Sequence, residues 1–230
     1  MIDASQFKLG TDRLADAGLN VFASIKVGRL PKGLVDQRHD GLTLCMIGHG
    51  GQKLWTKLKQ PLDVQQHPID HYTMTAVAQF SAKTLQDDNV IILYPSNEIV
   101  APLQRMGRAL QLTHQSLLGI DIHAEYGLWF AYRCALLTKA EIPEVLPSPF
   151  PSPCEDCQAK PCQTACPAGA VVQTGQEFKL SSCLDYRRTK TSSCVDRCLS
   201  RLACPVGHEH RYSPEQLRYH MGGLVSTAKI

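Results

Sequence analysis

Eight closely spaced cysteines in the last third of this chain carry its clearest chemistry. They fall into two sets, and each set ends in a Cys-Pro pair. The sets are Cys154, Cys157, Cys162 and Cys166, then Cys183, Cys194, Cys198 and Cys204. Cysteine thiolates hold iron–sulfur clusters, four to each four-iron cluster. The number and the spacing therefore predict two [4Fe-4S] clusters and a protein that transfers single electrons.

The two sets are expected to exchange one cysteine each. In two-cluster ferredoxins the cysteine that precedes proline ligates the other cluster of the pair. The simple bacterial run has two residues between its second and third cysteines, whereas four residues, 158–161, separate them here. The exchange predicts one cluster on Cys154, Cys157, Cys162 and Cys204, and the other on Cys166, Cys183, Cys194 and Cys198.

Zinc is the main alternative for the same cysteines. Two zinc sites of four cysteines each would use the same residues, and CxxC pairs are common in zinc sites. Zinc sites usually show two separated CxxC pairs without paired Cys-Pro endings, so the spacing favours iron–sulfur clusters. Disulfides are disfavoured in a reducing cytosol. The remaining cysteines, Cys45 and Cys134, lie in apolar stretches and are predicted to be buried as small hydrophobic residues.

Basic residues crowd the cysteine region. They are Lys179, Arg187, Arg188, Lys190, Arg197, Arg201 and Arg211. Charged side chains are mostly exposed, so a solvated loop that offsets the negative charge of the clusters is the simpler interpretation. The alternative is a docking patch for an acidic electron donor such as a flavodoxin or ferredoxin.

Composition excludes few classes of function. A formal net charge of +3 over 230 residues is too small to argue for a nucleic-acid partner. No apolar run approaches the roughly 20 residues that span a bilayer. The N-terminus carries acids early and no apolar core of a secretion signal. We therefore expect a cytoplasmic protein without a membrane or nucleic-acid partner.

A proline-rich segment at residues 142–153 predicts an extended connector between two domains. We place an α+β domain at 1–147 and a two-cluster domain at 148–230. The first domain shows helical patterns at 4–17, 67–85 and 100–119 and strand patterns at 19–27, 42–47 and 90–95, followed by a hairpin about Gly127. This alternation predicts an α+β or mixed-sheet domain.

The second half resembles a known arrangement of clusters. The segment CEDCQAKPCQTACPAGA, the lone Cys183 in SSCLDYRR and the closing Cys204-Pro205 pair carry the resemblance, which covers residues 154–207. They resemble the twin-cluster module of epoxyqueuosine reductase and the related reductive dehalogenases, which are cobalamin-dependent iron–sulfur enzymes. The resemblance implies a ferredoxin-like domain.

The first half resembles another cobalamin family. The segment GIDIHAEYGLWFAYRCALLTKAEIPEVLP is similar to the cblC-type proteins, which remove upper axial ligands from cobalamin. The likeness extends over most of residues 19–147. It implies a flavin-reductase- or nitroreductase-like mixed sheet that cradles the corrin, with flavin as the alternative occupant. His123 matches the family histidine near the corrinoid. Tyr126, Trp129 and Phe130 would line the corrin face, or at least two of them would pack in the core, as strand aromatics usually do.

Together these patterns predict an iron–sulfur, corrinoid-linked reductase that passes single electrons from two clusters to a bound corrinoid. It would process the corrinoid itself or reduce a small molecule. Epoxyqueuosine reductases carry a proton-donating aspartate near the substrate, but Glu98 is the sole acid between residues 90 and 118 and is a weak candidate for that role. The alternative is a ferredoxin-like electron-transfer protein without a substrate of its own.

Overall fold

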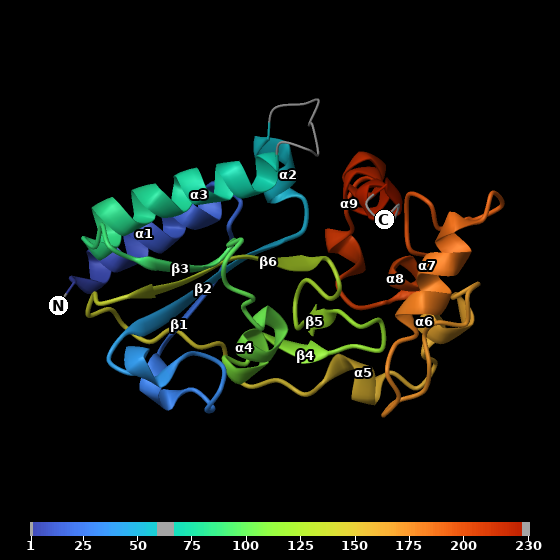
Figure 1. Cartoon of the computed structure of the whole chain (residues 1–230), viewed down its shortest axis with the longest axis horizontal. Helices are drawn as coiled ribbons and strands as arrows, with labels where there is room; N and C mark the ends of the chain where they lie inside the picture. The colour runs from blue at the N-terminus through green and yellow to red at the C-terminus, as the bar shows by residue number, and fades with distance from the viewer. Residues whose placement is uncertain (1, 59–66, 227–230) are drawn as a thin grey trace. The chain divides into compact units, whose positions relative to one another are not determined.

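The structure is a computed structural model that describes residues 2–58 and 67–226 (Figure 1). Contacts group the chain into two compact units. The first comprises Met1–Thr113 and Phe130–Pro149, and the second comprises His114–Trp129 and Phe150–Ile230. The predicted boundary between residues 147 and 148 falls near the end of the first unit. Residues 114–129 group with the cysteine region.

A four-stranded antiparallel sheet forms the core of the first unit, with strand order β1-β2-β6-β3 (Figure 1). The strands are β1 (Val21–Lys26), β2 (Thr43–Gly50), β3 (Ile91–Tyr94) and β6 (Phe130–Thr138). The expected mixed sheet is therefore wrong within the described residues. Strands β2 and β3 do run in the same direction, but β6 lies between them and pairs with both in the antiparallel sense.

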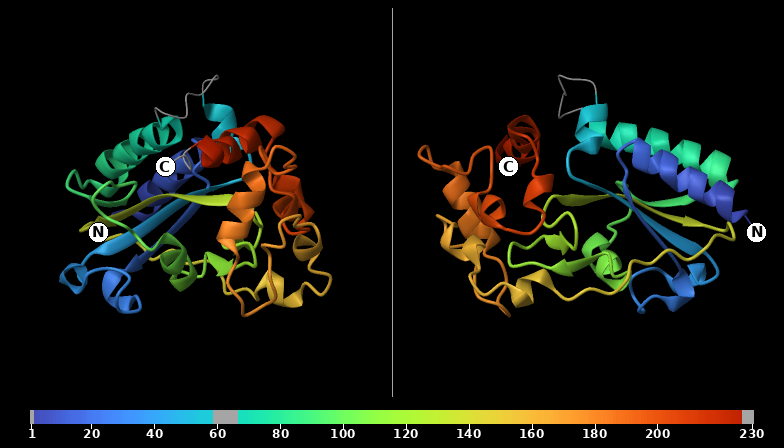
Figure 2. Two further views of the ribbon diagram at one scale, coloured as in Figure 1. Left: turned by 45° about the vertical axis from the view of Figure 1, so that its right-hand side comes forward. Right: turned by 180° about the vertical axis from the view of Figure 1, so that it is seen from behind.

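Two long helices, α1 (Ala4–Asp16) and α3 (Pro68–Phe80), lie side by side on one face of this sheet, as Figures 1 and 2 show. The Asp3 carboxylate caps the start of α1, because it accepts hydrogen bonds from the backbone amides of Ser5 and Gln6. Phe7, Phe22 and Phe80 join the helices to the strands, with ring centroids 5.7 to 6.5 Å apart. The predicted helices at 4–17 and 67–85 are confirmed. A π-helical turn, Ser81–Leu85, ends the second of them.

Among the described residues, four shorter elements also belong to the first unit. They are the 3₁₀ turns Val27–Arg29 and Gln37–His39, α2 (Lys53–Lys57) and α4 (Leu103–Ala109).

Two predictions around residues 100–130 are wrong. The helix expected over 100–119 ends at Ala109, because Gln111 adopts a left-handed conformation and Thr113–Gln115 forms strand β4. The hairpin about Gly127 is also absent, since β5 (Asp121–His123) pairs with β4 while β6 joins the main sheet. A single bridge between His123 and Gly127 remains of it.

Several short helices and the longer α9 build the second unit around a small apolar core. They are α5 (Pro153–Asp156), α6 (Pro161–Thr164), α7 (Leu180–Arg188), α8 (Leu199–Ala203), the 3₁₀ turn His208–His210 and α9 (Pro214–Ser226). Leu118, Ile122, Leu128 and Val171 form the apolar core, and five of the eight clustered cysteines pack in it or against it. A ferredoxin-like fold for this unit stays a prediction. Among the described helices of the whole chain, none combines the length and apolar character that a membrane span requires.

Candidate metal centre in the second unit

The eight clustered cysteines all lie in the second unit, most of them at the ends of short helices. Cys154 and Cys162 each follow a proline at the first position of a helix, where the missing amide hydrogen costs nothing. Cys198 precedes α8 and Cys204 follows it. The first turn of a helix leaves backbone N–H groups without partners inside the helix, so Cys154, Cys162 and Cys198 stand where such donors could reach a sulfur.

Four thiols line one pocket in this unit. They belong to Cys154, Cys157, Cys162 and Cys204. The pocket encloses about 380 Å³ of space between atoms, part of it open to solvent. Its other walls are largely apolar, with Leu118, Ile122 and Leu128 among them, and Lys160 is the charged residue in its lining. The pocket therefore offers four soft ligands in a largely apolar setting, a set of ligands that an iron–sulfur cluster or zinc could use.

These four thiols also interact electrostatically. Burial raises the pKa of Cys162, and the neighbouring thiols of Cys204, Cys154 and Cys157 raise it further. Burial likewise raises the pKa of Cys204, although the backbone amide of Val206 opposes it. Several thiolates gathered here require positive charge to stay ionised, and a bound metal group would supply it.

The other four cysteines interact in the same way. Burial is the main cause that raises the pKa of Cys183, and the nearby thiol of Cys198 raises it further. The Arg187 guanidinium lowers this pKa, while the thiols of Cys166 and Cys194 also raise it. Cys166 stands in the first run of the sequence, yet its thiol interacts with Cys183 of the second.

The surroundings of Cys166 favour its thiolate. Burial acts to raise its pKa, but hydrogen bonds from the backbone and from the Ser200 hydroxyl outweigh it, so the pKa is lowered. The amide nitrogen of Ala170 lies 3.3 Å from the Cys166 sulfur. Hydrogen bonds to sulfur are among the factors that set the potential of an iron–sulfur cluster.

Within the described ranges, no group of three or more histidine, cysteine or carboxylate side chains is placed so that it could hold one metal ion. A four-iron cluster binds each of its cysteines to a different iron, so its thiolates surround a larger body than a single ion. The choice between iron–sulfur clusters and zinc stays a prediction from the cysteine spacing.

Cys45 and Cys134 behave as the sequence predicts. Both are fully buried in the sheet of the first unit. Burial raises the pKa of Cys134 to about 12 and that of Cys45 still higher. They are core residues and take no part in the cysteine clusters.

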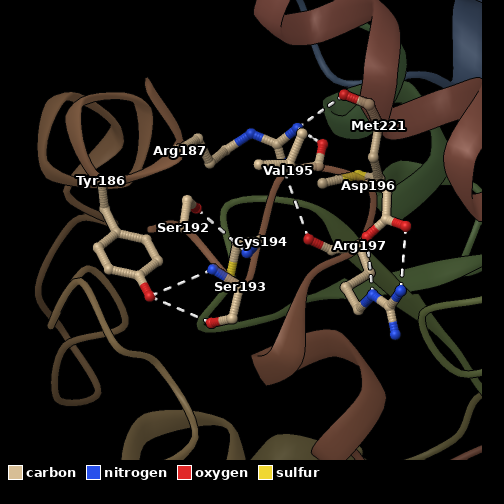
Figure 3. Close-up of polar contacts among 9 residues, drawn as sticks. All are labelled: Tyr186, Arg187, Ser192, Ser193, Cys194, Val195, Asp196, Arg197 and Met221. Atoms are coloured by element: carbon tan, nitrogen blue, oxygen red, sulfur yellow. Dashed lines mark hydrogen bonds and ion pairs between the residues drawn. The ribbon is translucent and has the colours of Figure 1, made fainter. Parts of the chain in front are cut away.

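One basic residue of the region was misjudged from the sequence. Arg187 was grouped with exposed cations, but its exposed fraction is 3%. Its guanidinium donates hydrogen bonds to the carbonyls of Val195 and Met221, at 3.0 and 2.6 Å (Figure 3). The available signal was its position four residues after Cys183 on α7, which places both on one face of the helix.

Lys160 is a second residue that spacing alone did not identify. It lies in the enlarged loop between Cys157 and Cys162 and adopts a left-handed conformation with φ 39°. Its ammonium donates a hydrogen bond of 2.8 Å to the Cys154 carbonyl. The longer loop is therefore closed by its own side chain.

His123, the expected corrinoid neighbour, is half-buried in β5 of the second unit. Its Nδ1 accepts hydrogen bonds from the amides of Glu125 and Tyr126, at 3.1 and 3.3 Å. Burial lowers the pKa of His123, although Glu125 raises it. A neutral ring whose Nδ1 accepts must carry its proton on Nε2. The Tyr126 ring lies 5.1 Å from that of His123 and 4.7 Å from that of His210.

Trp129 and Glu98 occupy places that do not favour their expected roles. Trp129 is completely buried; its ring lies 5.4 Å from that of Tyr212 and 4.5 Å from the Arg201 guanidinium. It packs the second unit together and presents no face to a ligand. Glu98 is exposed in a bend of the first unit, where its amide donates to the Ser96 hydroxyl. An exposed carboxylate lacks the enclosed setting of a tuned proton donor.

No protein-family profile matches the sequence, and no curated protein matches it. Solved structures do. The chain is similar to epoxyqueuosine reductase from Streptococcus thermophilus, with 14% identity and a TM-score of 0.54, over 88% of this chain and 66% of that one. It is also similar to the C. elegans B12-trafficking protein CblC, a homologue of human MMACHC, with 14% identity and a TM-score of 0.54, over 99% of this chain and 100% of that one.

A third similar structure is an epoxyqueuosine reductase solved with an epoxyqueuosine-modified tRNA-Tyr stem loop. It shows 13% identity and a TM-score of 0.52, over 93% of this chain and 69% of that one. The chain thus spans about two thirds of the length of the epoxyqueuosine reductases. Identity this low establishes the fold alone. The chain has an α+β fold of the kind found in both epoxyqueuosine reductase and CblC.

Proposed function

We propose that this protein is an iron–sulfur, corrinoid-linked reductase. The observation that carries the proposal is the pocket lined by Cys154, Cys157, Cys162 and Cys204, which are the four ligands expected of one cluster. Two bound [4Fe-4S] clusters would pass single electrons from a reduced flavodoxin or ferredoxin to a corrinoid. The likeness to a B12-trafficking protein and to epoxyqueuosine reductase supports the pairing of these cofactors.

In this proposal the eight cysteines are divided between two clusters as the spacing predicts. The first cluster takes the four pocket cysteines, and the second takes Cys166, Cys183, Cys194 and Cys198. The mutual effects on the pKa of Cys162 and Cys183 support this division. Apolar residues of the pocket, including Leu118 and Leu128, would keep water from the first cluster.

His123 would hold the corrinoid by donating a hydrogen bond. Two backbone amides already engage its Nδ1, and Nε2 carries the proton. A protonated nitrogen has no lone pair for cobalt, so the chain's own geometry favours a hydrogen bond from Nε2 to an amide of the corrin periphery over ligation. Tyr126, whose ring lies beside His123, would pack against the same ligand. Trp129 would support this segment from within the core.

A second candidate function is electron transfer without a substrate. The exposed position of Glu98 favours it, because a reductase acting on an organic substrate needs an enclosed proton source. The expectation of no nucleic-acid partner rests on the small net charge alone. One similar structure contains a tRNA stem loop, so RNA binding belongs among the tests.

Anaerobic purification tests the cluster half of the proposal. We expect brown protein with broad visible absorption, and about eight iron atoms and acid-labile sulfide per chain, as two four-iron clusters require. Colourless protein that carries zinc would reject both the reductase and the electron-transfer protein.

Titration with cob(II)alamin tests the corrinoid half. Its spectrum should change on binding, and His123→Ala should weaken the affinity about tenfold, the loss expected for one hydrogen bond to a ligand. His71→Ala, at an exposed position of the first unit, is the control. Brown protein that leaves the cob(II)alamin spectrum unchanged would favour the electron-transfer protein, and a parallel titration with flavin mononucleotide would reveal flavin as the occupant.

A further inference from the structure

Arg187 is a buried cation whose recorded hydrogen bonds all go to backbone carbonyls. Figure 3 shows its guanidinium between α7, the Val195–Arg197 segment and Met221 of α9. Nη2 donates to Val195 and Met221, and Nη1 reaches the Arg197 carbonyl at 3.5 Å. Within the described part of the chain, Nε has no hydrogen-bond partner and no carboxylate forms an ion pair with this residue.

A buried arginine without an anion is unfavourable. Removing a charge from water costs several kcal/mol, and carbonyl dipoles recover part of it. Proteins therefore bury arginine beside an anion or use it to neutralise one. None of the carboxylates in the described residues fills this role for Arg187.

The neighbours of Arg187 include cysteines assigned to the second cluster. Cys183 lies one helical turn earlier on the same face of α7. The carbonyls that Arg187 binds belong to Val195 and Arg197, which are the immediate neighbours of Cys194 and Cys198. Three of the four cysteines assigned to the second cluster are thus adjacent to this cation or to the backbone that it holds.

We propose that Arg187 is the positioning residue and buried counter-charge of the second iron–sulfur cluster, held by Cys166, Cys183, Cys194 and Cys198. The inference rests on the proposed function. Four thiolates give a [4Fe-4S] cluster a net negative charge, and each electron added makes it more negative. A fixed cation in a low-dielectric setting stabilises the reduced form more than the oxidised form, so it raises the reduction potential.

Two of the neighbouring cations, Arg188 and Arg197, are less suited to this role than Arg187. Arg188 is exposed and forms an ion pair with Asp185 at 3.4 Å. Arg197, which belongs to the Val195–Arg197 segment, forms an exposed ion pair with Asp196 at 2.7 Å. Solvent and partner carboxylates screen both cations, whereas Arg187 is screened by neither.

The test uses the full chain, purified anaerobically with its clusters. Chemical reduction supplies one electron per cluster, and electron paramagnetic resonance follows the potential of each. Arg187→Met removes the charge and keeps a long side chain, and it should shift the potential of one cluster to a more negative value. Arg187→Lys should keep that potential near the wild-type value. The shifted signal should be the one that Cys183→Ser alters, and Arg188→Met should shift neither signal.

Unchanged potentials in an iron-loaded Arg187→Met variant would overturn the inference. If Arg187→Met retains only about four irons per chain, the content of one cluster, then Arg187→Lys decides between the two explanations. Retention of about eight irons in the lysine variant supports the counter-charge, whereas loss in both variants rejects it in favour of hydrogen bonding alone. A wild-type chain without iron rejects the proposed function, and the inference with it.

Discussion

The Thr138 hydroxyl donates a hydrogen bond of 2.6 Å to Oδ2 of Asp87, a carboxylate that is almost completely buried. The amides of Lys139 and Asn89 also donate to this carboxylate. Burial acts to raise the pKa of Asp87, but these hydrogen bonds outweigh it and the pKa lies below the ordinary 3.8. The ionised Asp87 carboxylate thus links the end of β6 to the segment just before β3.

Asp87→Asn should destabilise the first unit by about 1–3 kcal/mol, because an amide cannot accept all these bonds. The folded pKa is depressed, so the stabilisation is complete above the unfolded pKa and is lost as the pH falls through the folded value. Urea unfolding at pH 7 and at pH 3 measures both effects. The adjacent Asp88 is exposed, so Asp88→Asn is the control. Equal losses in the two variants would contradict this account.

Single serine substitutions test the exchange of cysteines between the clusters. Cys204→Ser should disturb the same cluster as Cys154→Ser, and Cys166→Ser the same cluster as Cys183→Ser. Electron paramagnetic resonance of the reduced variants compares the altered signals. If Cys166→Ser instead matched Cys154→Ser, the sets would follow sequence order and the proposed division would be wrong.

Gly127→Ala should damage the second unit. Gly127 has φ 55°, and a Cβ there would lie 2.0 Å from the Val206 carbonyl oxygen, just after Cys204-Pro205. The backbone cannot yield as a flexible side chain does, so we expect a loss of at least about 2 kcal/mol, measured by thermal unfolding. Gly169 has nearly the same φ, 57°, and open space around it. Gly169→Ala should lose only about 1 kcal/mol, the penalty of the left-handed backbone.

Thiol reactivity should separate the cysteines of the two units. With a pKa of about 12, about one Cys134 thiol in ten thousand is ionised at pH 8. Iodoacetamide should therefore leave Cys45 and Cys134 unmodified in the folded chain and modify them after denaturation. Mass spectrometry of the labelled peptides measures this, with cysteines of the cluster-free second unit as the reactive reference. Rapid labelling of Cys134 in folded protein would show that the first-unit sheet opens.

Short-range patterns of apolar residues in the sequence were enough to predict much of the first unit. The apolar spacing around Phe7 and Val77 is enough to place α1 and α3, because each helix needs one buried face. The sheet was harder, since the position of β6 between β2 and β3 depends on contacts distant in sequence. The helix expected to continue past Ala109 failed for the same reason. Its later residues satisfy strand pairing with β5 instead.

The eight cysteines could be identified as candidate ligands from spacing alone, because closely spaced thiols are typical of iron–sulfur and zinc sites. Arg187 was not, because a cation in a basic run gives no sign of burial until the loop after Cys194 is seen to fold over it. Trp129 could line a ligand or pack in the core on its sequence alone, and the structure places its ring in the core with Tyr212.

Helix α8 has five residues, with Cys198 at its start and Cys204 at its end. On the proposed division these two cysteines ligate different clusters, so the length of the helix sets the distance between two redox centres. At 1.5 Å per residue, the six steps between them span about 9 Å. Electron tunnelling between the centres would then depend on helix length. Deleting one residue would shorten the path by about 1.5 Å and also turn Cys204 by about 100° around the helix axis, away from its pocket.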